Sequence, residues 1–588
     1  MSKQVSGTLI TRNYAAFRGV DFSDRKDEVN LYRSPDAINM WKNYKRENGK
    51  CIETRPDVEL LAEYSSAIYG LFFYGTGILV HSGKKLYKGQ TEIYSNMAEN
   101  KSNFFVYKNL VYIHDGTNYL VYDGNTVKDV VGYIPTTTIS KPPSGGGVLY
   151  EDINLLSPYR ENAFRADGVS TQYVLDAQNL DNEAVRVWKI NNQGQREEMT
   201  SGFTVNYTDG TVTFDTAPSV PLTDGQDNIF IRFKKEVEGA ADKIKNCTLV
   251  EVFDNRVFVS GNSDYPNLLW HCSLDDPTYF SDTDYYEEGT PESPVKSLVA
   301  GNNAIWVLKA PSEANTTIFY HNPTIDDEKG KVYPNVHSSI STGCRTLGIN
   351  FQDTICFYSE NGLEAITGDV TTEQVISHKS SLVDSRLLNE DLDKMILVEF
   401  GGYLATIIGD KIYLADSRQY SQVNDHYEYE WYYFDMGKNI TAAIRYPEGD
   451  ETGHAGSLLM ATTETIKVEG VPTTKYYVYT LDNYDKDRKV VSYWTTIEDE
   501  FNYPQYQKIT NKKGCVVDLE GEEVSIYAKA DNKSFDFIKK FKKIPKGYVV
   551  PRIKKKKWKS IQLKFYSEKP FSLYSSTLES YVGSYIKR

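Results

Sequence analysis

The residues that could do chemistry are spread along this 588-residue chain and form no recognisable catalytic motif. None of its eight histidines is spaced as in the zinc-binding HExxH sequence. The sequence has no GxSxG nucleophile turn, no GxxxxGKS or GxxxxGKT phosphate loop and no GxGxxG dinucleotide fingerprint. It therefore predicts no catalytic residue, no cofactor-binding residue, no cofactor and no metal ligand.

Acidic residues offer two weaker possibilities. The run DTDYYEE at 282–288 could supply oxygen ligands to Ca²⁺, but it lacks the glycine and the spacing of a known calcium loop. A glycosidase needs two carboxylates at a defined separation, which cannot be picked out by sequence among 80 acidic residues. The repeated S-x-D-x-G-x-x-W turns of propeller sialidases are absent, and SENGLEA at 359–365 comes nearest. We expect a protein that is not an enzyme.

Two of the histidines point instead to a repeated element. His81 lies in ILVHSGKKLYKG, which begins at Ile78, and His114 lies in VYIHDGTNYLVYDG, which begins at Val111. Each phrase has an apolar strand, a short turn with glycine and a second strand, which is typical of a β-hairpin. The equivalent positions favour a structural role for both histidines over a catalytic one.

The same hairpin pattern returns five more times, at intervals of roughly 50 residues, the length of a four-stranded propeller blade. Its apolar positions are Val259, Val307, Phe357, Ile408 and Met460. The 45 tyrosines and 25 phenylalanines also favour strands. We predict an all-β fold with a β-propeller of about seven blades; the alternative is a series of sandwiches with unrelated hairpins. If the copies are equivalent, Val259 and Val307 should point into the same core.

Two further β-domains are expected beside the propeller. The stretch KPPSGGG at 141–147 is interpreted as a linker that leaves the propeller, and alternating residues in 203–214 predict an antiparallel hairpin beyond it. An inserted β-sandwich and a C-terminal β-domain follow from these patterns. The predicted domains are an N-terminal segment packing on the propeller (1–64), the first blades (65–148), the inserted sandwich (149–235), the remaining blades (236–490) and the C-terminal β-domain (491–588).

The charge, the cysteines and the apolar runs of the sequence restrict which partners and which compartment we expect for the protein. A formal net charge of −14 argues against a protein whose whole surface grips nucleic acid. The most basic stretch, 539–559, could contact phosphate or an acidic partner subunit, or its lysines could protect edge strands from mispairing. The six scattered cysteines are expected to be free, buried thiols. Neither a secretory signal nor an apolar run long enough for a membrane span is visible, so we expect synthesis in a cytosol.

Three short motifs stand out near the N-terminus: FRGVD at 17–21, SPDAINM at 34–40 and ETRP at 53–56. Together they resemble the opening of bacteriophage tail hub or nozzle proteins, also called packaged-DNA stabilisation proteins of short-tailed phages. In that family the last motif usually continues with glycine, whereas Asp57 follows here. The segment 255–280 also resembles one of the family's blades.

The resemblance implies a non-enzymatic structural protein of the virion tail, made in the cytoplasm of the bacterial host. Such proteins form a ring, usually a hexamer, below the portal and adaptor proteins and beside tail fibre or spike proteins. The ring retains packaged DNA and forms the channel for genome ejection, without sequence-specific DNA binding. An acidic lumen would let a duplex slide with little friction. The alternatives are a receptor-binding or glycan-processing tail protein on a propeller scaffold, and a cellular scaffold propeller.

Assembly is expected to depend on the parts outside the propeller, because a closed propeller hides its sheet edges. The assembly candidates are Arg18, Asp21, Pro35, Asp36, Asn39, Arg55, Lys554, Lys555, Lys556 and Lys557. Ser34 and Pro35 also form a helix-start signal, which predicts a short helix within the second motif. Its apolar face would hold Ala37, Ile38, Met40 and Trp41.

Overall fold

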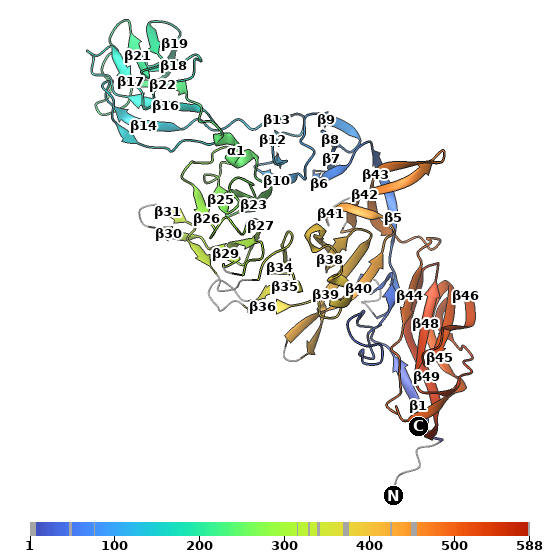
Figure 1. Ribbon diagram of the computed structural model, residues 1–588. Helices are drawn as coiled ribbons and strands as arrows, with labels where there is room; N and C mark the ends of the chain where they lie inside the picture. Colours follow the sequence, from blue (N-terminus) through green and yellow to red (C-terminus); the bar gives the residue numbers. More distant parts are fainter. Residues whose placement is uncertain are drawn as a thin grey trace. The chain divides into compact units, whose positions relative to one another are not determined.

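The computed structural model of the chain is built almost entirely of β-strands (Figure 1). It describes residues 7–45, 50–75, 77–313, 315–326, 330–337, 342–367, 375–423, 426–447 and 456–585. The chain divides into two compact units: unit 1 combines Met1–Glu92 with Thr342–Arg588, and unit 2 is Ile93–Ser341. None of the helices in the described ranges has the length and apolar character that a membrane span requires.

The described residues include seven sets of four neighbouring strands that carry the repeat: six are separate four-stranded sheets, and the seventh, β37–β40, forms one end of a 14-stranded sheet. Four belong to unit 1, and the last strand of the first one crosses the boundary into unit 2. They are β6 (Ile68–Tyr74), β7 (Gly77–Ser82), β8 (Lys85–Lys88) and β9 (Thr91–Tyr94); β33 (Ile349–Phe351), β34 (Thr354–Ser359), β35 (Gly362–Thr367) and β36 (Val375–His378); β37 (Ile396–Phe400), β38 (Tyr403–Ile408), β39 (Lys411–Val423) and β40 (His426–Asp435); and β41 (Asn439–Arg445), β42 (Leu458–Val468), β43 (Val471–Asn483) and β5 (Asp57–Tyr64).

The other three sheets belong to unit 2. They are β10 (Asn103–Tyr107), β11 (Leu110–His114), β12 (Tyr119–Tyr122) and β13 (Val127–Asp129); β23 (Leu249–Phe253), β24 (Arg256–Ser260), β25 (Leu268–His271) and β26 (Tyr285–Glu287); and β27 (Val295–Gly301), β28 (Ala304–Lys309), β29 (Ile318–His321) and β32 (Asn335–His337). A small hairpin of β30 (Thr324–Asp326) and β31 (Gly330–Val332) precedes β32.

Every predicted hairpin copy lies at the same place in its sheet. The seven copies fall on the second strands, which are β7, β11, β24, β28, β34, β38 and β42. His81 and His114 lie on β7 and β11, and both side chains are fully buried. The predicted fold class is confirmed: an all-β chain with seven sheets of propeller type, an inserted β-sandwich and a C-terminal β-domain.

One detail of that prediction is wrong, because Val259 and Val307 do not share a core. Val259 packs with Phe105 and Trp270, between the sheets β10–β13 and β23–β26. Val307 packs with Phe258, between the sheets β23–β26 and β27–β32. Each valine therefore faces the sheet that precedes its own. Stacked sheets have a separate apolar layer at each interface, so equivalent residues repeat from layer to layer.

The last sheet of the repeat is completed by a strand from the beginning of the chain. β5 pairs antiparallel with β43, with Tyr64 opposite Tyr476 and Val58 opposite Leu481. A cluster of buried residues from β5, β6, β7, β42 and β43 then joins this sheet to the sheet β6–β9. The chain before the first complete sheet is thus fixed to the last sheet by backbone hydrogen bonds, which sequence spacing alone does not reveal.

The inserted sandwich begins earlier than predicted, at Thr136 rather than at residue 149. Its six-stranded sheet runs β15–β14–β16–β22–β18–β19, and its three-stranded sheet runs β17–β21–β20. The stretch 141–147 connects β14 to β15 in a hairpin, so its interpretation as a linker is wrong. The strands are β14 (Thr136–Lys141), β15 (Val148–Leu149), β16 (Tyr159–Phe164), β17 (Gln172–Val174), β18 (Arg186–Ile190), β19 (Arg196–Met199), β20 (Phe203–Asn206), β21 (Thr211–Phe214) and β22 (Ile229–Lys234). Helix α1 (Ala240–Lys245) leads back to β23.

The two ends of the chain fold together in unit 1 (Figure 1). β1 pairs with β49, β2 with β44, β4 with β49, and β3 with both β4 and β40. The C-terminal strands are β44 (Ser492–Thr495), β45 (Tyr506–Ala530), β46 (Asp536–Val549), β47 (Lys556–Trp558), β48 (Ile561–Ser567) and β49 (Phe571–Tyr585), and the N-terminal strands are β1 (Leu9–Tyr14), β2 (Ala37–Ile38), β3 (Met40–Trp41) and β4 (Ile52–Thr54). Two short turns, α2 (Asp384–Leu387) and the 3-10 turn η2 (Leu392–Lys394), precede β37.

Candidate functional site

The three N-terminal motifs meet in one buried region of unit 1, which we call the motif junction. The first motif, 17–21, passes closely beside β40. Val20 N donates a hydrogen bond to the Trp431 carbonyl oxygen at 2.7 Å, and Ser34 N donates to the Gly19 carbonyl at 2.9 Å. Gly19 has φ 100°, and a Cβ there would overlap the Trp431 carbonyl oxygen. Only glycine fits this close approach of two backbones.

The charged residues of the first motif shape the loop that follows it. Asp21 is buried, and its Oδ1 accepts hydrogen bonds from Ser23 N at 3.2 Å and Asp24 N at 3.0 Å. Burial raises the pKa of Asp21. Arg18 is half-buried, with its guanidinium 5.9 Å from the centre of the Tyr32 ring. Both predicted assembly candidates thus have contacts within the chain.

The second motif does not form the predicted short helix. Ser34 Oγ accepts a hydrogen bond from Asp36 N at 3.2 Å, as a cap would, but it donates its own proton to the Thr495 carbonyl at 2.6 Å. Pro35 is buried, and Asp36 Oδ1 accepts a 3.0 Å hydrogen bond from Tyr493 Oη. The chain then pairs with β44 as β2. The helix prediction is wrong because a strand from the far end of the sequence supplies the backbone partners.

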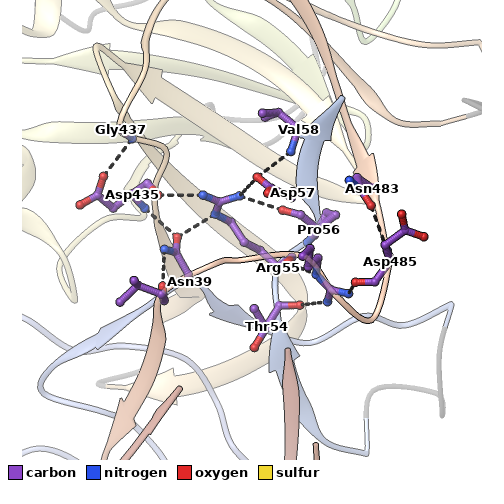
Figure 2. Close-up of polar contacts among 12 residues, drawn as sticks. Asn39, Thr54, Arg55, Pro56, Asp57, Val58, Asp435, Gly437, Asn483 and Asp485 are labelled. Atoms are coloured by element: carbon purple, nitrogen blue, oxygen red, sulfur yellow. Dashed lines mark hydrogen bonds and ion pairs between the residues drawn. The ribbon is translucent and has the colours of Figure 1, made fainter. Parts of the chain in front are cut away.

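Asn39 holds the second motif to two other segments (Figure 2). Its φ is 59°, a left-handed conformation that asparagine tolerates better than most residues. Its Nδ2 donates to the Val491 carbonyl at 2.8 Å, and its Oδ1 accepts from Arg55 Nε and Asp435 N, both at 2.9 Å. One amide side chain therefore joins the third motif, the end of β40 and the chain before β44.

Arg55 of the third motif is a buried cation surrounded by neutral oxygen atoms (Figure 2). Its NH1 donates to the Pro56 carbonyl at 2.8 Å and its NH2 to the Asp435 carbonyl at 3.0 Å. The Asp57 carboxylate, at 3.9 Å, is farther than these oxygen atoms. Burial lowers the pKa of Arg55 to about 10, so the side chain stays charged at neutral pH. The carbonyl oxygen atoms satisfy its donors and offset part of the desolvation cost.

A second buried arginine, which was not predicted from the sequence, binds the backbone of the third motif. Arg488 lies between β43 and β44 and donates through Nε to the Arg55 carbonyl at 3.2 Å and through NH2 to the Thr54 carbonyl at 3.1 Å. Its NH1 donates to the carbonyls of Tyr484 and Asp485. Within the sequence DNYDKDRK it has the appearance of a solvated loop charge. No local pattern could have identified its role at the junction, because its partners in the third motif are more than 400 residues away.

A buried ion pair beside the first two motifs was also missed. Arg33 Nε and NH2 donate to the two carboxylate oxygens of Glu430 at 2.8 and 3.0 Å, and the side chains are 7% and 0% exposed. Burial raises the pKa of Glu430, and the hydrogen bonds and charge of Arg33 act against that rise. This bidentate geometry is the strongest form of an arginine–carboxylate contact. It fixes the N-terminal segment to β40.

The ten predicted assembly candidates fall into two groups. Six lie at the motif junction: Arg18, Asp21, Pro35, Asp36, Asn39 and Arg55. The other four lie in or just before β47 of the C-terminal β-domain: Lys554, Lys555, Lys556 and Lys557. Of these four, Lys555 is half-buried and forms an ion pair with Asp536, and the others are exposed. No observation tests their roles in assembly, which stay predictions.

Among the described residues, the group that comes nearest to a catalytic arrangement surrounds His378 on β36. Its Nε2 lies 2.7 Å from Asp384 Oδ2, and its Nδ1 lies 3.5 Å from Glu364 Oε1. The hydrogen bond to Asp384 and the second carboxylate raise the pKa of His378 to about 10. The imidazole is therefore charged at neutral pH and cannot serve as a general base. Ser380 Oγ donates to Asp384 rather than to the histidine, so these residues do not form a serine triad.

The cysteines offer no activated nucleophile in the described structure. All six are free and buried, as predicted. Burial raises the pKa of Cys272, Cys356 and Cys515 to about 12, which keeps each of these thiols protonated near neutral pH. The described residues also contain no cluster of three or more histidine, cysteine or acidic side chains that could hold a metal ion.

Comparisons with known proteins give weak likenesses only. No protein-family model and no curated protein matches the chain. Among solved structures, an exo-β-1,3-galactanase from Phanerochaete chrysosporium matches with 8% identity and a TM-score of 0.19, over 56% of this chain and 95% of its own. An exported protein from Bacteroides fragilis matches with 9% identity and a TM-score of 0.25, over 65% and 90%. The extracellular domain of a hybrid two-component system from B. thetaiotaomicron has 10% identity and a TM-score of 0.24, over 96% and 85%. Likenesses at this level carry no argument about function.

Proposed function

We propose that this chain is a non-enzymatic structural protein of a phage virion, the nozzle or hub of the tail. Six copies form a ring below the portal and adaptor proteins, with tail fibre or spike proteins beside it. The ring retains the packaged DNA and forms the channel through which the genome leaves. The duplex passes through the channel without sequence-specific contacts.

One observation carries the proposal: the three motifs of the resemblance depend on one another in the folded chain. Gly19 allows the backbone contact with β40, Asn39 bonds to Arg55, and Arg55 bonds to the end of β40. Separate short matches could arise by chance in a long chain. Motifs that cooperate in one buried junction support the inheritance of a whole architecture, and the resemblance assigns that architecture to tail nozzles.

The junction also suggests how assembly contacts are distributed. The side chains of Asn39 and Arg55 are buried and bonded within unit 1, so they act on assembly by fixing the two ends of the chain to each other. Direct contacts with neighbouring subunits would then come from exposed residues of unit 1. Arg18 and Asp36, which are partly exposed, and the lysines at 554–557 remain the candidates for such contacts.

Deletion of the gene from the genome that encodes the chain tests this function. The expected particles have heads that package DNA but do not keep it, so that DNase-resistant genomes per particle fall at least tenfold. A copy of the gene supplied in trans should restore retention. Particles that keep their DNA and infect normally would contradict the proposal. Particles that keep their DNA but adsorb poorly would favour the receptor-binding or glycan-processing alternative.

A further inference from the structure

The basic residues of the C-terminal β-domain follow one side of its longest strand. On β45, Val517 pairs with β46 on one side and with β49 on the other, and Ile509 pairs with β47 and β49 in the same way. β46 and β47 thus lie one after the other on one side of β45, with β49 and β48 on its other side. Among the described strands, both pair only with β45. We call the residues 531–559, which form this outer border of the sheet, the basic edge.

The basic edge has a strong positive charge on an otherwise acidic chain. It contains eleven lysines and one arginine against two aspartates, and all of these basic residues except Lys555 are exposed. Nearby carboxylates neutralise some of them: Glu523 pairs with Lys540 and Lys542, and Glu500 pairs with Lys559. Seven others have no carboxylate within ion-pair distance among the described residues: Lys533, Lys539, Lys543, Arg552, Lys554, Lys556 and Lys557.

Protection of the sheet edge explains only part of this pattern. Lysines along β46, together with Pro545, would suffice to prevent another strand from pairing there. Lys554 precedes the next paired segment, and β47, which contains Lys556, is only three residues long. So short a strand gives little template for mispairing. The charge there is larger than edge protection needs.

The composition of the edge favours phosphate groups over a protein surface as its partner. Protein–protein interfaces are depleted in lysine and enriched in arginine and aromatic residues. Lysine binds phosphate as a point charge and does not demand the planar geometry that an arginine–carboxylate pair uses. Eleven lysines to one arginine is the pattern of sequence-independent attraction to a polyanion. At about 0.1 M salt, charges more than about 10 Å away are screened, so the acidic remainder of the chain does not cancel the edge.

We propose that the basic edge binds the phosphate backbone of duplex DNA without sequence preference. Lys554, Lys556 and Lys557 supply three of the unpaired charges of this site, in and just before β47. In the proposed ring, the contact would add reversible friction against DNA loss. The inference rests on the proposed function only for the identity of the DNA as the packaged genome; the binding can be tested on the purified chain alone.

The test measures binding of a labelled 30-base-pair duplex of random sequence to the full chain by fluorescence anisotropy, from 50 to 200 mM NaCl. The test variant replaces three edge lysines by serine: Lys554→Ser, Lys556→Ser and Lys557→Ser. The control variant removes the same charge from exposed lysines of other sheets: Lys84→Ser, Lys128→Ser and Lys189→Ser. Circular dichroism and sedimentation velocity on all three proteins show that the fold is kept and whether copies associate.

The wild type and the control should bind with equal affinity, and the test variant at least tenfold more weakly at 100 mM NaCl. Each phosphate contact adds about 0.9 to the slope of log K against log salt, so the loss of three should reduce that slope by about 2.7. Absence of DNA binding by the wild type at 50 mM NaCl overturns the proposal. So does equal binding by the test and control variants. Loss of self-association by the test variant, without DNA binding by any form, would assign the edge to an acidic surface of a second copy.

Discussion

Replacing Arg33 by alanine is expected to lower the free energy of unfolding of unit 1 by about 3–5 kcal/mol. The substitution leaves the Glu430 carboxylate, which is 0% exposed, without its bidentate partner. A buried charge without a partner is far more costly than a missing surface contact. Urea unfolding followed by tryptophan fluorescence measures the loss, since Trp431 lies directly after Glu430 on β40.

The loss should depend on pH in a defined direction. Without Arg33, the main influence that lowers the pKa of Glu430 is lost and only the weaker charge of Arg18 still opposes burial, so the pKa rises further above its value in the unfolded chain. The folded variant then binds a proton that the unfolded chain does not. Its loss of unfolding free energy is therefore largest at pH 8 and becomes smaller as the pH falls toward 5. The double variant Arg33→Met/Glu430→Met should recover most of the stability, because both charges are removed.

Arg25→Ala is the matched control in the same segment. Arg25 pairs with Asp27 at 2.8 Å, but its side chain is 72% exposed. Exposed ion pairs contribute about 0–1 kcal/mol, so this variant should unfold almost as the wild type does. If Arg33→Ala and Arg25→Ala destabilise equally, the buried pair does not hold the N-terminal segment to β40.

Replacing Gly19 by alanine is expected to cost about 3 kcal/mol of unfolding free energy. Alanine is strained at φ 100°, and its Cβ would overlap the Trp431 carbonyl oxygen. Relief requires the two backbones to separate, which breaks the 2.7 Å hydrogen bond from Val20 N to that oxygen. The effect should appear as a lower urea midpoint for unit 1.

Gly437→Ala separates backbone strain from the steric overlap. Gly437 also has a positive φ, 62°, but no atom lies within 4 Å of the position of its Cβ. Only the left-handed conformation then opposes the substitution, at a cost of about 1–2 kcal/mol. A Gly19→Ala variant no less stable than Gly437→Ala would mean that the close approach at Trp431 is not needed.

The repeat was predictable because its signal is local. Each hairpin copy, such as the one around His114, combines an apolar strand, a turn and a second strand within 14 residues. The pairings that join distant segments have no such signal. β5 completes the sheet of β43. β14 pairs in parallel with β16, and β15 lies between these two strands in the sequence. No local signal in the sequence indicates this pairing, so the sandwich was predicted to start later in the chain than it does.

The candidate site was predictable only in part, for the same reason. The three motifs were singled out by resemblance, but how they interact depends on residues such as Arg488 and Glu430, which lie in unremarkable contexts hundreds of positions away. Ser34 shows how a correct local signal can mislead. Its hydroxyl does accept from Asp36 N, but the backbone of β44 then directs the chain into a strand.

Cryo-electron microscopy of purified particles from the genome that encodes this chain tests the central claim most directly. We expect a closed ring of copies below the portal and adaptor, with the seven sheets, the inserted sandwich and the joined terminal strands fitting each subunit's density around a DNA channel. Particles complete with portal, adaptor and tail but without this chain in the ring would contradict it. So would density for the chain only at the tips of fibres.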